Sequence, residues 1–591
     1  MPTNISYFDT KLQADTGIQE QIKNCLASYL FPNLDFAVTR IYENATTPEE
    51  LQNYKDKTPQ FSNGEKVYFA SEDVRQKIYP EKSDGAAYGS LVFTPCNDFK
   101  ELKNLKILVV DDETGENGGK IPNDKAKFLV GDCYGRMSSD LAYELTGTTN
   151  TPLQFRLGIK PQEGSEIHRI AKGTLAPARL LENLGQPTIS RTQDGRLKTK
   201  TGYDLILATS SFKGRKDESK IQPGEYNITV GIGVKTLAQY GLHSLGTQIL
   251  VNYPKGVKAD ILPRIELAAQ RLAEVQSDPR KIAQYFIEKN EKQLQLRGQN
   301  VSVTESTTLA HNEQDKDETN LDETDLESNE QQDNQHFYSI LKNCVEHHPQ
   351  LLEHPNIVNK LTTLIRKEWT DIATGRAIKF QSGLAQPSLE LQKDEVCVPY
   401  LPEGEKLIVT RSPLINSNGV ITLTNKHLPK FANEQGTIHI HPETAAAYLQ
   451  ADFDGDRLAF EKASLYPILT AEIEEKQLPE NRHTEVIKAE KQKYIAETFG
   501  EIAIAASANK IGLIANNIQK AVALQNEVDS LPDEEKEKFL SSLKYQCLSI
   551  KTIDVHKLDI PEEKKQQCIS IQQKANLLLT SNTIAGQEIA K

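Results

Sequence analysis

The chain has 591 residues and a formal net charge of −13, with 38% hydrophobic and 26% charged residues. At about 100–200 residues per domain, this length predicts about three to five structural units, and the composition excludes collagen-like, purely coiled-coil and wholly disordered chains. No stretch approaches the roughly 20 apolar residues of a membrane span, and the N-terminus lacks the basic start and apolar run of a secretory signal. The seven cysteines form no CxxC pair, which is typical of reduced thiols. We therefore expect a cytoplasmic protein without a membrane partner.

The first 300 residues mix short apolar runs with turn signals. This pattern predicts five strands, at 105–112, 126–132, 203–212, 226–234 and 246–254. Helical spacing of apolar residues then predicts helices over 259–298. Between residues 168 and 216, ten basic residues stand against three acidic ones, and a basic region in an acidic chain suits a phosphate-rich partner. A solvated basic face without any partner is the plain alternative.

An acidic segment separates two lobes. Residues 312–334 hold ten Asp and Glu residues against the single Lys316. From about 301 to 335 the chain has almost nothing to bury, so it cannot offset its ordering entropy and is expected to be a disordered linker.

The second lobe repeats the order of the first, a β-rich unit with helices around it. Helices are expected at 337–348, 356–376 and 482–550. Four short strands are expected between them, at 395–401, 406–413, 419–425 and 436–442.

The sharpest motif is Asp452-Phe453-Asp454-Gly455-Asp456. Carboxylates at alternate positions point to one side of an extended strand, and three that close together repel one another unless a cation neutralises them. All-oxygen ligands favour Mg²⁺, Mn²⁺ or Ca²⁺. An EF-hand is excluded, because Arg457 and Ala463 stand where that loop needs Gly and Glu. A solvated acidic turn, a phosphosugar mutase loop and a polymerase loop remain, although the mutase family's TASHNP-like serine loop does not occur in this chain.

The context of this motif resembles the active-site segment of the RNA polymerase β′ subunit. There a His-Pro pair and a short Ala-bearing helix precede NADFDGD, as His441-Pro442 and residues 443–450 precede the motif here, with Gln450 in place of Asn. Arg411-Ser412-Pro413, 41 residues before Asp452, is similar to the R-x-P element beside the incoming nucleotide.

Other segments are similar to single-chain polymerases of the RNA-silencing type. Residues 131–142 resemble their DGxGxIS…LA element, 154–158 their QIRxGG and 171–176 their KGxxAV. Residues 210–214 occupy the place of a second barrel lysine, and 511–517 and 552–557 resemble LGxIxN and AVDFxKTG. Together these segments span about 126–560, in matching order. The HPGD that follows R-x-P in the family is absent, and residues 1–125 match nothing recognised.

The resemblance implies an α+β fold with two double-psi β-barrels in one chain, each followed by helical segments. The implied divisions are an unassigned N-terminal α/β domain over 1–125, a lysine-bearing first barrel over 126–258, a helical connector over 259–300, the acidic linker over 301–335, a second connector over 336–395, a second barrel over 396–470 and a helical cleft-supporting region over 471–591.

The resemblance also implies roles for individual residues. Asp452, Asp454 and Asp456 would hold Mg²⁺, with Mn²⁺ as the alternative, and Lys172 and Lys213 would be catalytic cations. The substrate-binding set is Arg411, Gln450, Lys216 and Arg215. Taken alone, Lys172 and Lys213 are ordinary surface lysines, and His439 and His441 are more typical of hydrogen-bonded structural residues than of metal ligands.

The predicted function is template-dependent RNA polymerisation from nucleoside triphosphates by two metal ions, on a single-stranded RNA or DNA template that the sequence does not decide. A further protein that supplies a downstream head domain is an implied partner. The alternatives are a catalytically silent nucleic-acid-binding factor of the same fold and, with weaker support, a metal-dependent phosphosugar mutase.

Overall fold

The computed structural model describes most of residues 96–296 and 337–477. The described residues are 5–7, 24–32, 36–40, 57–63, 66–71, 91–92, 94, 96–162, 166–178, 184, 188–191, 197–200, 202–214, 221–245, 247–296, 337–412, 414, 419–477 and 532–534. The chain divides into two compact units, Met1–Leu513 and Ile514–Lys591, and all described residues except 532–534 belong to the first unit. Outside the described residues lie the predicted linker over 301–335, Arg215 and Lys216, the predicted helices of 482–550 except for 532–534, and the motifs at 511–517 and 552–557.

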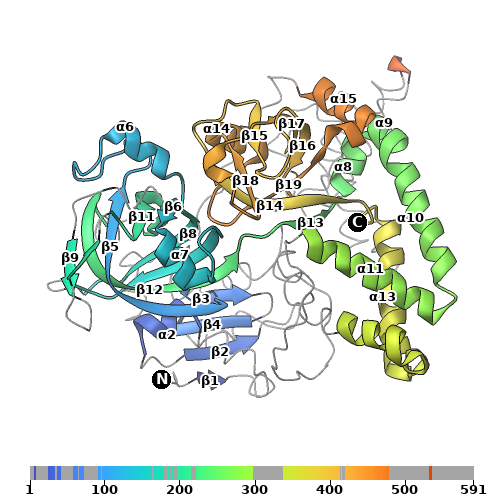
Figure 1. Ribbon diagram of the computed structural model, residues 1–591, viewed down its shortest axis with the longest axis horizontal. Helices are drawn as coiled ribbons and strands as arrows, with labels where there is room; N and C mark the ends of the chain where they lie inside the picture. The colour runs from blue at the N-terminus through green and yellow to red at the C-terminus, as the bar shows by residue number, and fades with distance from the viewer. Residues whose placement is uncertain are drawn as a thin grey trace, which may run out of the picture. The chain divides into compact units, whose positions relative to one another are not determined.

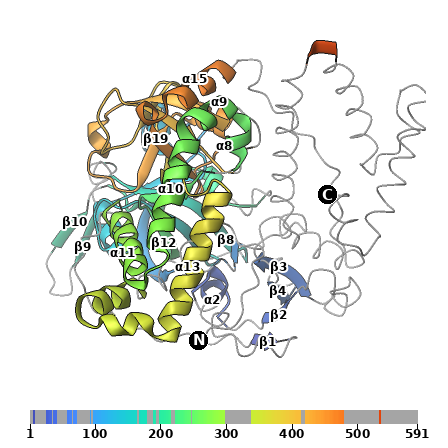
Figure 2. The ribbon, with the colours of Figure 1, turned by 90° about the vertical axis from the view of Figure 1, so that its right-hand side faces the viewer.

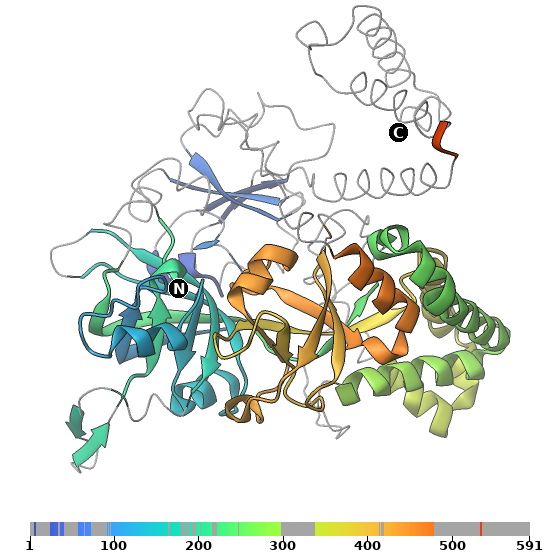
Figure 3. The ribbon, with the colours of Figure 1, turned by 90° about the horizontal axis from the view of Figure 1, so that it is seen from above.

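Six strands of the first lobe close into a ring, called barrel 1 (Figure 1). Around the ring they are β11 (Leu205–Ala208), β5 (Asp98–Val110), β12 (Gly224–Leu237), β7 (Leu153–Ile159), β8 (Arg169–Pro177) and β6 (Tyr134–Met137). Phe155 and Leu157 of β7 belong to its apolar core, although residue 156 between them is basic. This is the period of two that a strand with one inward face requires. A separate two-stranded sheet of β9 (Thr188–Arg191) and β10 (Leu197–Lys200) is inserted between β8 and β11 (Figure 3).

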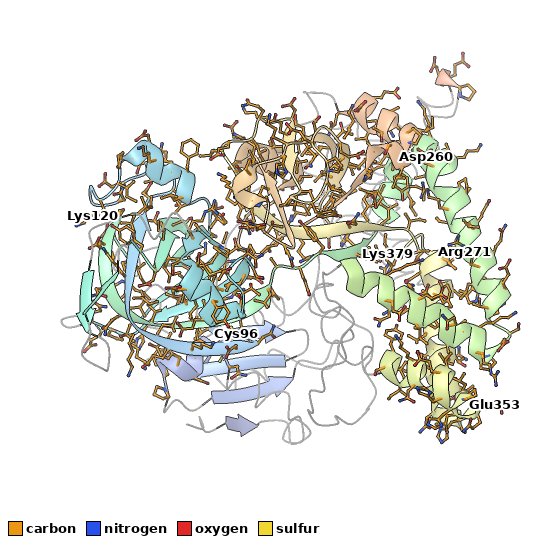
Figure 4. All side chains as sticks on the ribbon, viewed as in Figure 1. Cys96, Lys120, Asp260, Arg271, Glu353 and Lys379 are labelled. Carbon is orange, nitrogen blue, oxygen red and sulfur yellow. The ribbon has the colours of Figure 1, made fainter. Side chains whose placement is uncertain are left out.

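Six strands of the second lobe form barrel 2, which the pairing of β14 with β19 closes. Around the ring they are β14 (Lys379–Pro387), β18 (Thr437–Ile440), β15 (Glu395–Cys397), β17 (Val420–Asn425), β16 (Lys406–Thr410) and β19 (Arg457–Lys462). Strand β13 (Gly241–Ser244) pairs with the start of β14, where Figure 4 labels Lys379. Only residues 238–240 separate β13 from β12 of barrel 1.

The two barrels have the same topology. With the strands of each numbered one to six in chain order, both rings read 1-5-2-4-3-6. In both, the pairs 1/5 and 2/4 are parallel and the other four pairs are antiparallel. The ring is unchanged when strands 1–3 are exchanged with strands 4–6, which is the double-psi arrangement. The expected fold of two double-psi barrels is confirmed.

Helices lie beside both barrels. In the first lobe, α8 (Thr247–Asn252), α9 (Pro254–Gly256), a π-helical turn η6 (Val257–Ile261), α10 (Leu262–Val275) and α11 (Pro279–Leu296) follow β13. The two long helices pack with α13 (Pro355–Ala373), as Figure 2 shows. Asp260 Oδ2, labelled in Figure 4, accepts the backbone N–H of Leu469 at 2.8 Å and so binds η6 to α15 (Pro467–Lys476), which follows barrel 2.

The N-terminal part contains a four-stranded sheet in the order β1-β2-β4-β3 and a short helix. The strands are β1 (Ile5–Tyr7), β2 (Phe36–Arg40), β3 (Lys57–Asn63) and β4 (Lys66–Ser71), and the helix is α2 (Leu26–Leu30). Helix α2 contacts β7 and β12, and its Leu26 and Leu30 lie close to Gly158, where an added Cβ would stand 3.0 Å from Leu30. None of the helices among the described residues is long and apolar enough to cross a bilayer.

Two expected strands and two expected boundaries differ from the structure. Residues 126–132 include the end of α6 (Asn123–Ala126) and the 3₁₀ turn η3 (Lys127–Leu129), and 246–254 include α8. A short apolar run does not distinguish a strand from a buried helix, which is the reason for both errors. Barrel 1 begins at Asp98 rather than at 126, and barrel 2 at Lys379 rather than at 396, because the first strand of each barrel carries none of the recognised motifs.

Candidate active site between the two barrels

The aspartate loop connects β18 to β19 of barrel 2. After β18 the chain forms α14 (Pro442–Thr444) and a π-helical turn, η10 (Ala445–Leu449), and Gln450 then takes the left-handed conformation with φ 49°. π-Helical turns are rare and concentrate at functional sites. At its far end the loop is held by the backbone N–H of Ala385 in β14, which donates to Asp456 O at 2.8 Å. The loop therefore follows a π-helical turn and is fixed directly to the barrel wall at its far end.

The facing wall comes from β7 and β8 of barrel 1. In their antiparallel register, Gln154 is opposite Thr174 and Arg156 is opposite Lys172, so all four side chains share one face of the strand pair. Gln154 Nε2 donates to Asp454 O at 2.8 Å, and Thr174 Oγ1 donates to Phe453 O at 2.7 Å. Barrel 1 thus holds the backbone of the loop that barrel 2 provides.

Gly455 is required by this contact. Its φ of +145° is rarely adopted by residues with a side chain, and a Cβ there would stand 1.9 Å from Gln154 Nε2. The glycine therefore makes room for the neighbouring barrel.

Two of the three carboxylates are paired with basic side chains. Lys172 Nζ contacts the carboxylate of Asp454 across the barrel junction. Arg411 binds Asp456 with two nitrogens, Nε at 2.9 Å from Oδ2 and Nη2 at 3.0 Å from Oδ1. The third arginine nitrogen, Nη1, donates to Gln450 O at 3.2 Å. The predicted lysine and arginine therefore reach the predicted aspartates from two different barrels.

For the remaining carboxylate, Asp452, the ionised form is costly in free energy. Burial, followed by the nearby charges of Asp454 and Asp456, raises its pKa from 3.8 to about 6. Burial also acts to raise the pKa of Asp454, but the charge and hydrogen bond of Lys172, with a contribution from Arg156, outweigh it and the pKa falls. The loop holds like charges close together and depends on basic neighbours to keep them ionised.

Lys213 lies on barrel 1 after β11, in a different set of contacts. Its Nζ donates to Ser210 O at 2.7 Å and to Cys133 Sγ at 2.9 Å. Cys133 has φ 55°, where the similar DGxGxIS element has glycine, and burial raises the pKa of its thiol to about 12. The sulfur is therefore a neutral acceptor, and these hydrogen bonds hold Lys213 against the turn at Cys133.

The structure brings together six of the nine predicted residues: Asp452, Asp454, Asp456, Lys172, Arg411 and the backbone of Gln450. Lys213 is held in its own set of contacts, and Arg215 and Lys216 fall outside the described residues. Gln154, Arg156 and Thr174 were missed. Strand alternation places them on the face of Lys172, and that signal was present in the QFRLG and KGT segments.

The two predicted histidines have structural contacts. His439 is fully buried beside Glu434, and His441 Nδ1 accepts the N–H of Glu443 at 3.2 Å, as the cap of α14. Over the residues that the structure describes, no group of three or more His, Cys, Asp and Glu side chains is arranged so that it could hold a metal ion. In the aspartate loop, two carboxylates are directed to Lys172 and Arg411 instead.

Replacing Gly455 with alanine tests the loop contact. We expect Gly455→Ala to lower the free energy of unfolding by about 2 kcal/mol, because the added methyl meets Gln154 and the backbone is strained. The matched control is Gly404→Ala, since Gly404 also has positive φ but open space around it, and it is expected to cost only about 1 kcal/mol. Urea unfolding of both variants measures the difference, and equal losses would contradict the contact.

Because the pKa of Asp452 is raised, removing its carboxylate should increase the free energy of unfolding in a pH-dependent way. Folded protein holds this proton more tightly than unfolded chain, so the ionised carboxylate destabilises the fold above about pH 6 and the effect disappears below about pH 4. Asp452→Asn should raise the free energy of unfolding by about 1 kcal/mol at pH 8, a value reduced for solvent screening. Urea unfolding with a chelator at pH 8 and pH 4 measures it. Asp454→Asn, which breaks the Lys172 pair, should instead lose stability at pH 8, and a loss for Asp452→Asn would contradict the assignment.

The chain matches known proteins by structure and not by sequence. No family model matches the chain, and no curated protein sequence does. Among solved structures, the chain is similar to the RNA dependent RNA polymerase QDE-1 from Thielavia terrestris, with 11% identity and a TM-score of 0.44. The match covers 93% of this chain and 60% of that protein.

Proposed function

We propose that the chain is a template-dependent nucleotidyltransferase that adds ribonucleotides to an RNA 3′ end. The observation that carries this proposal is the convergence of Lys172 from one double-psi barrel and Arg411 from the other on the carboxylates of a DFDGD loop. Phosphoryl transfer is catalysed mainly by positioned charge, so both signs of charge must converge on one place.

The aspartates are the proposed metal ligands. Three carboxylates in five residues form an all-oxygen donor set that suits Mg²⁺ or Mn²⁺. Burial, and after it the charges of Asp454 and Asp456, raise the pKa of Asp452, and a bound cation would oppose both effects. When bound, such a metal lowers the pKa of an attacking hydroxyl and stabilises charge on phosphate oxygens. To hold it, Asp454 and Asp456 would exchange their present contacts with Lys172 and Arg411 for the ion.

The basic residues then have substrate roles. Lys172, once released from Asp454, is close enough to meet the phosphates of a nucleoside triphosphate at the aspartate loop. Arg411 presents a planar fork of donors that suits the hydroxyl groups of a ribose. Lys213, held by Ser210 and Cys133, is proposed as a second cation for the departing pyrophosphate. Arg215 and Lys216 stay candidates for the same role.

The proposed macromolecular partner is a single-stranded nucleic acid template. Pairing with the template selects the nucleotide, so no side chain of the site needs to read a base. Both RNA and DNA templates therefore belong in the test, and a protein that provides a head domain is the proposed additional partner.

The test is incorporation of labelled ribonucleotides by purified full-length chain with Mg²⁺, on single-stranded RNA and DNA in parallel. Asp454→Asn should reduce product by at least about 10²-fold, because one of the groups that organise the transition-state charge is lost. Asp98→Asn, an exposed carboxylate in β5, is the matched control and should leave the rate unchanged. Folding of each variant is checked by circular dichroism. Product that persists in Asp454→Asn would refute the site, and no product from folded wild type on either template would favour a silent binding factor.

Replacing Gln450 with glycine distinguishes a role of its backbone carbonyl from a role of its side chain. Its left-handed backbone favours glycine, and Arg411 uses its carbonyl oxygen. If the carbonyl is what matters, Gln450→Gly should raise stability by up to about 1 kcal/mol and keep incorporation within about twofold. A large rise in KM for the nucleotide would show instead that the Gln450 side chain binds substrate, as the sequence predicts.

A further inference from the structure

A buried group of charged and aromatic residues lies where β6 of barrel 1 meets barrel 2. Arg136 Nη1 is 3.9 Å from Glu434 Oε1, and Glu434 Oε2 is 3.0 Å from His439 Nε2. The exposed fractions of these side chains are 8%, 7% and 0%. Arg136 belongs to β6 and His439 to β18, and Glu434 precedes β18 in the same lobe, so the interaction crosses the junction.

Aromatic rings surround this polar network, which comprises the ion pair of Arg136 and Glu434 and the imidazole of His439, whose pKa is lowered by burial. Phe431 is stacked on His439 with ring centres 3.6 Å apart and planes 8° apart. The guanidinium of Arg136 lies 5.1 Å from the ring centre of Tyr134 and 5.7 Å from that of Phe431. Tyr134 itself belongs to the apolar core of barrel 2 although it comes from barrel 1. The apolar core of barrel 2 therefore extends onto barrel 1 at this point.

A buried ion pair adds little net stability, and in some proteins it instead specifies which geometry the fold adopts. Well-packed apolar residues of similar volume often replace a buried ion pair at no loss of stability, whereas removal of one partner leaves an uncompensated charge. Apolar contacts such as those of Tyr134 are nearly indifferent to small sliding movements, but a buried ion pair has a defined direction and distance. The network thus favours one position of β6 relative to β18.

The two strands that carry the network lead directly to the candidate site. In barrel 1, β6 is paired with β8, where Arg136 is opposite Ala176, on the strand that carries Lys172. In barrel 2, β18 leads into the aspartate loop, and its partner β14 holds the other end of that loop through Ala385. Movement of β6 along β18 would therefore move Lys172 relative to Asp454.

We propose that Arg136, Glu434 and His439 are positioning residues that fix the register of the two barrels and so place Lys172 against the aspartate loop. The effect of this placement on catalysis rests on the proposed function. The contact between Lys172 and Asp454 is a property of the fold, and crosslinking measures it independently of activity.

The test is zero-length carbodiimide crosslinking of the full chain, which joins an amine to a carboxylate in contact, with the crosslinked peptides quantified by mass spectrometry. In the double variant Arg136→Met/Glu434→Leu the fold should persist, because apolar residues can replace a buried ion pair. The Lys172–Asp454 crosslink should fall by about fivefold or more. The value of kcat should fall by about tenfold or more, since small misplacements of catalytic groups are costly. KM for the nucleotide should change little. The Lys289–Glu368 crosslink between α11 and α13 is the internal control and should stay constant.

Two further variants keep the test decisive. Glu434→Gln retains the shape of the side chain and removes its charge, so it should also lower the Lys172–Asp454 crosslink, and it replaces the double variant if that one does not fold. Asn150→Ala removes an exposed hydrogen bond of 2.6 Å to Asn433 O at the same junction and should leave the crosslink unchanged. An unchanged crosslink in both folded network variants would overturn the positioning role. Wild type that crosslinks but does not polymerise would refute only the proposed function.

Discussion

Repulsion among three carboxylates in five residues is the constraint that the rest of this structure serves. The aspartate loop cannot neutralise itself, and each barrel contributes a basic residue, Lys172 from one and Arg411 from the other. The backbone of the loop is held in the same way from both sides, by Gln154 and Thr174 across the junction and by Ala385 within its own barrel. Neither barrel alone contains a balanced site. A charge cluster that is costly in isolation becomes stable only where two similar folds meet.

The two barrels have the same ring order, and each contributes its own set of groups to the site. A double-psi ring closes on itself and has no free edge within it. Each barrel has its own apolar cluster, and that of barrel 2 also includes Tyr134 and Ala176 of barrel 1. The two barrels carry opposite charges at their junction, with basic side chains on β7 and β8 in one and acidic side chains before β19 in the other. The same topology thereby supports both halves of one site.

Local sequence predicted the parts of this site but not its junction. The DFDGD motif, Arg411 and Lys172 were recognisable because their residue types and spacing are specific, and the strands of barrel 2 because alternation and turn residues mark them. Gln154 and Thr174 were missed because their partners are backbone atoms about 300 residues away, at Asp454 and Phe453. Strand β5 was predicted as a strand, yet its membership of barrel 1 depends on pairing with β11 and β12, which no local pattern encodes. The strands predicted at 126–132 and 246–254 were wrong for a different reason, because a short apolar run does not distinguish a strand from a helix.

Residues 238–240 connect barrel 1 to β13, which pairs with β14 of barrel 2, and this short segment is held at both ends. Ala238 donates to Pro152 O of barrel 1, and Gln239 O accepts Arg457 of barrel 2 at 2.8 Å. Because both barrels belong to one chain, the meeting of Lys172 and Asp454 is an intramolecular event that does not depend on how dilute the protein is. Two separate barrel chains would have to find each other by diffusion and would lose the full entropy of association.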